Sequence, residues 1–137
     1  MTGTPPVGPD DRGPAQSVLV VEDDEELRKV IVRHLVRWGF APMEASDGGI
    51  ALEEFRRERG SLGAILLDIM LPVLDGVEVA RQVLAERPGM PIVAYSAAFN
   101  DQIEADLREI GVENFLAKPF RAEELLTKLR EAIAGPI

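Results

Sequence analysis

Four short apolar runs of the sequence end in polar residues that can take part in chemistry. These residues are Glu22, Asp23, Asp68, Ser96 and Lys118. Two carboxylates about 4 Å apart repel each other by roughly 4 kcal/mol at an effective dielectric constant of 20, so a cluster of acids favours a bound cation. Hard oxygen ligands suit Mg²⁺ or Mn²⁺. Such a cation beside an ammonium and a hydroxyl group can hold a phosphoryl group, and one of the carboxylates can accept it as an acyl phosphate.

Asp68 is an acid within the otherwise apolar stretch AILLDIMLPVLDG, residues 64–76. A buried charge is costly unless it is paired or has a function. In open α/β sheets, ligands bind beyond the carboxyl ends of the strands, where the strand order reverses. We therefore expect Asp68 at the mouth of the hydrophobic core rather than inside it, on the sheet edge where the other polar residues converge.

The composition excludes several classes of protein. The 137 residues are enough for one domain with a single core, and 46% of them are hydrophobic. The absence of cysteine excludes disulfides, zinc–thiolate sites and thiol nucleophiles, and a single histidine, His34, cannot form a multi-histidine metal site. A net charge of −9 argues against a nucleic-acid partner. With no apolar signal core and no stretch near the ~18 residues of a membrane span, we expect a cytoplasmic protein with no membrane partner.

Hydrophobic periodicity predicts five strands that alternate with five helices. The predicted strands are 17–21, 41–45, 63–68, 90–96 and 113–118, and the predicted helices are 24–38, 47–59, 75–87, 100–111 and 121–134. Strict alternation indicates an α/β fold, a doubly wound parallel sheet with helices on both faces. The domain spans 17–134, preceded by a flexible Pro/Gly-rich tail over 1–16 and followed by a short C-terminal end over 135–137.

Four motifs in this order resemble one known family. They are VLVVEDDEELR, LLDIMLPVLDG, IVAYSA and NFLAKPF. Together they resemble the receiver domain of bacterial two-component response regulators, and the resemblance covers about 17–134. It implies a (βα)5 flavodoxin-like fold with the strand order 2-1-3-4-5. It also implies a signalling switch rather than an enzyme, and we expect a stand-alone, chemotaxis-type single-domain regulator.

The resemblance assigns roles to the acidic residues. Asp68 corresponds to the phosphoacceptor, Asp23 to the main metal ligand, and Glu22 to the acidic neighbour that acts through a metal-bound water. Met70 corresponds to the residue whose backbone carbonyl binds the Mg²⁺, or possible Mn²⁺, ion. The stretch EDD offers two acidic pairs; the family pattern favours Glu22 and Asp23, which leaves Asp24 as the N-cap of the following helix.

The remaining site residues follow from the same resemblance. Lys118 corresponds to the lysine that pairs with the phosphoryl oxygens, and Pro119 to the proline that follows it through a cis peptide bond. Ser96 corresponds to the catalytic and switch hydroxyl, and Phe115 to the aromatic residue that turns inward behind it. A core role for Phe115 is equally consistent with the sequence.

The implied phosphoryl donor is a histidine kinase or a histidine phosphotransfer protein. In the helix over 24–38 we expect Arg28, Val32, Arg33 and Val36 to form an outward docking stripe for it, although scattered valines on a solvated face are also common.

The implied output is a changed shape on the face formed by the helix over 100–111, the strand over 113–118 and the helix over 121–134. A downstream protein would bind there, or the phosphoryl group would be relayed. Asn114 and Lys128 stand where winged-helix regulators have an acid and an arginine, which favours a monomer in the unphosphorylated state.

Other functions on similar folds fit less well. A haloacid dehalogenase-type phosphatase needs an aspartate two residues after its nucleophile, where this chain has Met70. A flavin-binding domain needs a phosphate-binding loop after the first strand, where the acidic stretch EDDEEL repels anions. A degenerate receiver, folded but not phosphorylated, is the remaining alternative.

Overall fold

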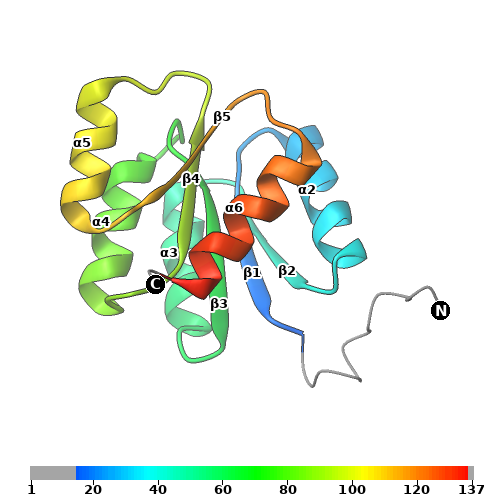
Figure 1. Cartoon of the computed structure of the whole chain (residues 1–137). Helices are drawn as coiled ribbons and strands as arrows, with labels where there is room; N and C mark the ends of the chain where they lie inside the picture. The colour runs from blue at the N-terminus through cyan, green and yellow to red at the C-terminus, as the bar shows by residue number, and fades with distance from the viewer. Residues whose placement is uncertain (1–14, 136–137) are drawn as a thin grey trace.

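Five parallel strands form one sheet at the centre of the computed structural model, which describes residues 15–135 (Figure 1). Their order is β2-β1-β3-β4-β5, as predicted. The strands are β1 (Ser17–Val21), β2 (Ala41–Ala45), β3 (Leu62–Asp68), β4 (Ile92–Ser96) and β5 (Asn114–Ala117). The fourth strand begins two residues later than predicted, after Pro91, whose ring nitrogen has no N–H to donate to a sheet.

Helices cover both faces of the sheet. They are α2 (Glu25–Arg37), α3 (Gly48–Arg57), α4 (Gly76–Glu86), α5 (Asp101–Ile110) and α6 (Ala122–Ala134). Helices α2 and α6 pack on one face, and α3, α4 and α5 pack on the other (Figure 1). The doubly wound α/β fold expected from the sequence is confirmed.

The central strands are buried on both sides. Residues 18–21 of β1 have no exposed surface, and 64–67 of β3 are at most 1% exposed. This burial explains why both strands are continuously apolar rather than alternating. Alternate side chains of β1 enter two separate cores, one under α2 and α6 and the other under α3, α4 and α5.

Side-chain caps set the starts of four helices. Asp24 accepts hydrogen bonds from the Glu26 and Leu27 amides, and Asp47 accepts one from Ile50. Both caps are as predicted, and Asp75 and Asn100 cap α4 and α5 in the same way. The EDD stretch therefore has one structural acid, Asp24, which leaves the other two free for the site.

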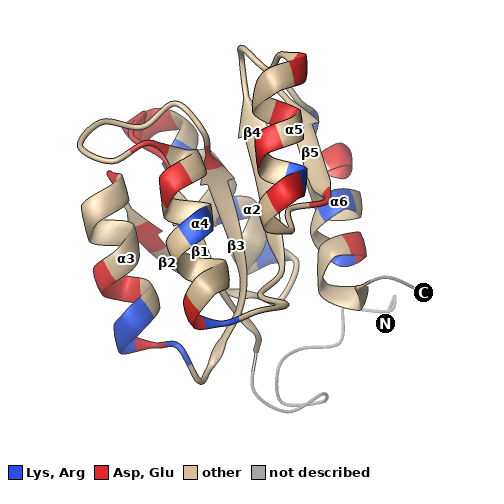
Figure 2. Ribbon diagram, turned by 90° about the vertical axis from the view of Figure 1, so that its left-hand side faces the viewer, with Lys and Arg blue, Asp and Glu red and all other residues tan. Residues whose placement is uncertain are grey.

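The surface over α3, α4 and α5 carries interspersed charges of both signs (Figure 2). Arg56 of α3 and Glu86 of α4 form an ion pair at 2.7 Å, which links these neighbouring helices. Among the described residues, no helix is both long and apolar enough to cross a membrane.

The ends of the chain lie mostly outside the described residues. Of the tail expected over 1–16, only residues 15 and 16 are described, and the Gln16 carbonyl accepts a hydrogen bond from the Ala41 amide at 2.8 Å. This bond extends the pairing of β1 with β2. Within the C-terminal end expected over 135–137, only Gly135 is described.

Candidate functional site

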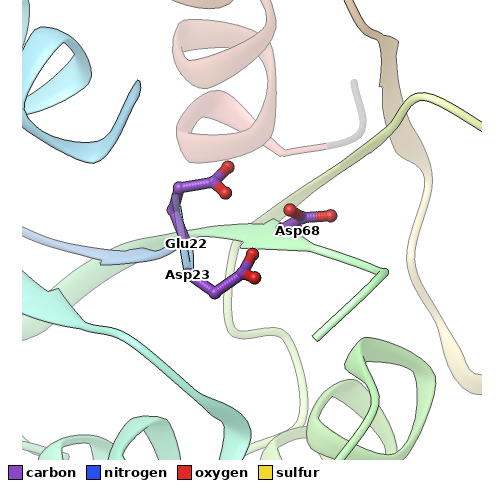
Figure 3. A group of neighbouring side chains, drawn as sticks. All are labelled: Glu22, Asp23 and Asp68. Atoms are coloured by element: carbon purple, nitrogen blue, oxygen red, sulfur yellow. The ribbon is translucent and has the colours of Figure 1, made fainter. Parts of the chain in front are cut away.

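Three carboxylates gather beyond the carboxyl ends of β1 and β3 (Figure 3). Glu22 and Asp23 directly follow β1, and Asp68 is the last residue of β3. The two strands are paired neighbours, with Val21 opposite Leu67, so the residues after them meet. One oxygen from each acid lies within 4.8 Å of the others. The structure thus brings together the acids that the sequence predicted.

The Asp68 side chain is held by hydrogen bonds to both of its oxygens. Oδ1 accepts from the Met70 amide at 2.9 Å, and Oδ2 accepts from Nζ of Lys118 at 2.9 Å. Asp68 is the last residue of β3 and lies at the mouth of the core as expected, although only 2% of it is exposed. Its hydrogen-bond partners allow the carboxylate to be buried there.

Glu22 is more deeply buried, with no exposed surface. Its Oε2 accepts from the Asp24 amide at 3.0 Å, whereas Oε1 lies 3.2 Å from Nζ of Lys118 without an aligned hydrogen bond. Burial raises the pKa of the Glu22 carboxyl, and the neighbouring Asp68 charge adds to this, although the Asp24 amide and Lys118 act in the opposite direction. Its charged form is thus poorly compensated.

Lys118 supplies the positive charge nearest these acids. Burial lowers the pKa of its ammonium, but the hydrogen bond and the charges of Asp68 and Glu22 outweigh that effect, so the pKa is raised. Lys118 therefore stays protonated at neutral pH. Its side chain is 22% exposed, so part of this residue reaches the surface.

The donor set fits a divalent cation. Glu22, Asp23 and Asp68 carry three negative charges against the single charge of Lys118, and every nearby carboxylate ligand is a hard oxygen. Asp23 is exposed, so the group opens to solvent on one side. Mg²⁺ prefers one or two carboxylates and retains several waters, and the open side of this group leaves room for those waters.

Ser96, the predicted switch hydroxyl, ends β4 next to β3. It is 1% exposed, and its Oγ accepts a hydrogen bond from the Ala98 amide at 3.0 Å. The strand ends place it beside Asp68, because Asp68 is opposite Tyr95 in the sheet. The peptide bond between Lys118 and Pro119 is cis, as the sequence resemblance predicted.

Phe115 is half-buried on β5 and contacts two groups. Its ring packs edge-to-face on Phe99 with the centroids 5.8 Å apart, and the Arg108 guanidinium lies 4.7 Å from its centroid. In this structure Phe115 therefore has the packing role that the sequence left open as an alternative. Met70 is 57% exposed, and its backbone amide donates to Asp68.

Sequence reasoning missed Tyr95, the residue before Ser96. Tyr95 is fully buried, its hydroxyl donates to the Val21 carbonyl at 3.3 Å, and its ring centroid lies 5.3 Å from Nζ of Lys118. Burial raises the pKa of its phenol well above the ordinary value. The available signal was an aromatic residue among the aliphatic residues of IVAYS, directly before a candidate site residue.

The structure corrects the expected docking stripe on α2. Arg28 is only 14% exposed, because its guanidinium binds the Glu22 carbonyl and the Glu44 carboxylate. Val32 is half-buried and packs against the core under α2. Arg33 is exposed and Val36 is 60% exposed, so only these two remain on the surface.

Comparisons with known proteins agree with this fold. A model of the response regulator receiver domain family matches residues 18–130, and the chain belongs to that family. This is a class of phosphoacceptor signalling domains.

Individual relatives and structures are similar over most of this chain. Response regulator MprA of Mycobacterium leprae is 36% identical over 113 residues, 82% of this chain and 49% of MprA. Sensory transduction protein RegX3 of Mycolicibacterium smegmatis is 34% identical over 117 residues, 85% of this chain and 50% of RegX3. The CheY-like receiver domain protein of Methanospirillum hungatei has a TM-score of 0.82 at 23% identity, over 88% of this chain and 94% of its own. The chain spans about half the length of these curated relatives.

Proposed function

We propose that this domain takes a phosphoryl group from a phosphohistidine of a partner protein onto Asp68, with Mg²⁺ bound by the neighbouring acids. The observation that carries the proposal is the Asp68 carboxylate itself. One of its oxygens is bound to the Lys118 ammonium, and the acids Glu22 and Asp23 lie beside it. A carboxylate in such a setting can act as a nucleophile. Nearby positive charge then offsets the negative charge of the phosphoryl group that the carboxylate accepts.

The chemical step is a displacement at phosphorus. An oxygen of Asp68 forms a bond to phosphorus as the bond between phosphorus and the donor imidazole nitrogen breaks, and the imidazole keeps the electron pair and takes up a proton. Lys118 Nζ is already 2.9 Å from Oδ2 of Asp68, so it can follow the phosphoryl oxygens with little movement. In this proposal Lys118 offsets the negative charge that the phosphoryl group brings.

The proposed metal ligands are Asp23, Asp68 and the Met70 carbonyl, with Glu22 acting through a bound water. When bound, Mg²⁺ neutralises charge on the phosphoryl oxygens and on the acids. The same hard oxygens also suit Mn²⁺. The exposed Asp23 carboxylate supports this assignment, because it leaves a side of the cluster open for waters and for the donor.

We further propose that Ser96 and Phe115 transmit the change. Ser96 Oγ accepts a hydrogen bond from the Ala98 amide, at the end of the strand next to Asp68. A phosphoryl group on Asp68 offers this hydroxyl a strong acceptor, and movement of Ser96 alters the packing of Phe115 on Phe99. The affected surface is that of α5, β5 and α6, where a downstream protein would bind.

The partner is proposed to be a histidine kinase or a histidine phosphotransfer protein that docks near the exposed residues Arg33 and Val36. Output by protein contact or phosphorelay, without an output domain, stays a prediction, because the curated relatives are about twice as long as this chain. The expected cytoplasmic location, monomeric state and lack of a nucleic-acid partner also stay predictions.

Intact mass after incubation with acetyl phosphate tests the proposal. With Mg²⁺ we expect the wild-type protein to gain one phosphoryl group, and we expect no gain when the metal is chelated. Asp68→Asn should gain none, whereas Asp101→Asn, which removes an exposed acid from α5, should react as the wild type does. A folded wild-type protein that gains no mass, and that also fails to bind beryllium fluoride, would indicate a degenerate receiver.

A further inference from the structure

Arg28 joins three elements around the acidic site. It ends the first turn of α2, and its Nη1 donates a hydrogen bond to the backbone carbonyl of Glu22 at 2.8 Å. Its Nε donates to Oε1 of Glu44, in β2, at 2.9 Å. The side chain is 14% exposed, against 48% for Glu44. One guanidinium therefore connects the helix, the end of β1 and the edge strand.

The bond to the Glu22 carbonyl fixes a particular peptide unit. That carbonyl and the Asp23 amide belong to the same planar group, because a peptide bond does not rotate freely. An arginine that holds the carbonyl therefore sets the direction in which the chain enters Asp23. The Glu22 amide is bound to the Ala45 carbonyl at 3.0 Å, and the Asp24 amide is bound to Oε2 of Glu22 at 3.0 Å. The carbonyl of the peptide unit between them accepts its hydrogen bond from Arg28.

We infer that Arg28, held in place by Glu44, is a positioning residue that orients the Glu22–Asp23 peptide so that both carboxylates face Asp68. This inference rests on the proposed metal site. Arg28 contacts the backbone of the acidic pair and not a carboxylate of the site, so it acts through the loop. Its planar guanidinium suits this role, because it presents two donors in fixed directions to a carbonyl and a carboxylate.

Because Arg28 is positively charged, the direction in which metal affinity changes when it is replaced tests the inference. A guanidinium near a cation site repels the cation, so loss of the charge alone would strengthen metal binding. Loss of positioning would weaken it, and residues that orient metal ligands commonly change metal affinity by about 10-fold to 100-fold. The two effects have opposite directions in one variant.

We would measure Mn²⁺ and Mg²⁺ affinity by isothermal titration calorimetry for Arg28→Met, which keeps most of the apolar stem. The expected result is an affinity about ten-fold lower than that of the wild type. Arg37→Met is the matched control, because it removes the same charge from an exposed position of the same helix. Its affinity should be unchanged or slightly higher.

Two further variants separate positioning from a general loss of fold. Glu44→Gln removes the charge of the partner of Arg28 and should lower metal affinity by a smaller factor than Arg28→Met does. Arg28→Lys should keep only part of the affinity that Arg28→Met loses, because an ammonium does not present two donors in fixed directions. At saturating Mg²⁺, the acetyl phosphate reaction of Arg28→Met should regain its maximal rate while its half-saturating Mg²⁺ concentration rises. Glu44→Gln carries the test if Arg28→Met does not fold.

Two results would count against the account in different ways. An affinity of Arg28→Met equal to or higher than that of the wild type, or a Glu44→Gln affinity equal to the wild type where only that variant folds, would overturn the positioning role and leave the proposed function intact. A folded wild-type protein that binds neither metal would overturn the proposed metal site, and this inference with it.

Discussion

Nζ of Lys118 lies 2.9 Å from Oδ2 of Asp68, and this contact ties the residue after β5 to the end of β3. The same ammonium lies 3.2 Å from Oε1 of Glu22. One partly exposed cation therefore serves two acids that are almost completely buried. The stability of the metal-free domain should depend on it, because a buried charge that loses its partner is costly.

Lys118→Met should destabilise the metal-free protein by about 2 kcal/mol at pH 7, below the roughly 3–5 kcal/mol typical of a fully buried pair because the Lys118 side chain is partly exposed. Urea unfolding with a chelator present measures this. Added Mg²⁺ should reduce the difference, since it supplies the missing positive charge. Lys128→Met, at a more exposed position on α6, should change stability by less than about 0.5 kcal/mol. Equal stability of Lys118→Met and wild type without metal would contradict this reasoning.

The stability of Glu22→Gln, compared with that of the metal-free wild type at the same pH, should increase as the pH rises. Burial raises the folded-state pKa of Glu22 above its ordinary value of 4.5. An acid with a raised pKa binds its proton more tightly in the folded state than in the unfolded state. Its contribution to folding stability is therefore complete below the unfolded-state pKa and is lost as the pH rises through the folded-state pKa. Glutamine has no such loss. Unfolding curves from pH 4 to pH 8 measure the difference, and a constant offset across this range would be inconsistent with the raised pKa.

Gly76→Ala should destabilise the domain by about 3 kcal/mol, because the chain packs too closely for a side chain at this position. A Cβ there would lie 2.6 Å from the Asp68 carbonyl oxygen and 2.6 Å from Cα of Ile69, both backbone atoms. Gly60→Ala is the control, since a Cβ at that position meets no atom within 4 Å. Thermal unfolding of both variants checks the prediction, and similar midpoints would argue against a tight approach at Gly76.

Val73→Gly should raise stability by about 0.5 kcal/mol. Glycine relieves the strain of the left-handed backbone conformation in the folded state, but it also raises the entropy of the unfolded chain, which offsets part of that gain. Val73 has φ of 71°, and the Leu74 amide donates to the Pro72 carbonyl at 2.8 Å across it, which forms a tight three-residue turn. The side chain is 82% exposed, so its removal costs little packing. A lower midpoint of urea unfolding than that of the wild type would show that the turn is not strained.

The sequence was sufficient to predict the fold and the acidic cluster for a common reason. Apolar periodicity determines which segments become strands and which become helices, and parallel strands bring their carboxyl ends to one edge. The acids Glu22, Asp23 and Asp68 each lie at such an end, so their meeting follows from topology alone. The caps Asp24 and Asp47 could be predicted because they depend only on neighbouring residues.

Interactions between distant residues were harder to predict. Arg28 seemed to be an exposed docking residue, yet it bonds to Glu44 in β2, and helical periodicity does not indicate that contact. Val32 lies at the border of the buried face of α2, where periodicity does not separate half-buried from exposed positions. The burial of Asp68 depends on Lys118, fifty residues away in the sequence.

The most direct test of the central claim is to locate the phosphoryl group within the chain. Protein treated with acetyl phosphate and Mg²⁺ would be reduced with borohydride, which converts an aspartyl phosphate to homoserine, and its peptides would be sequenced by mass spectrometry. The account predicts homoserine at position 68 alone, and none when the metal is chelated. Homoserine at Asp23 or at another aspartate, with Asp68 unmodified, would contradict the assignment of Asp68 as the phosphoacceptor.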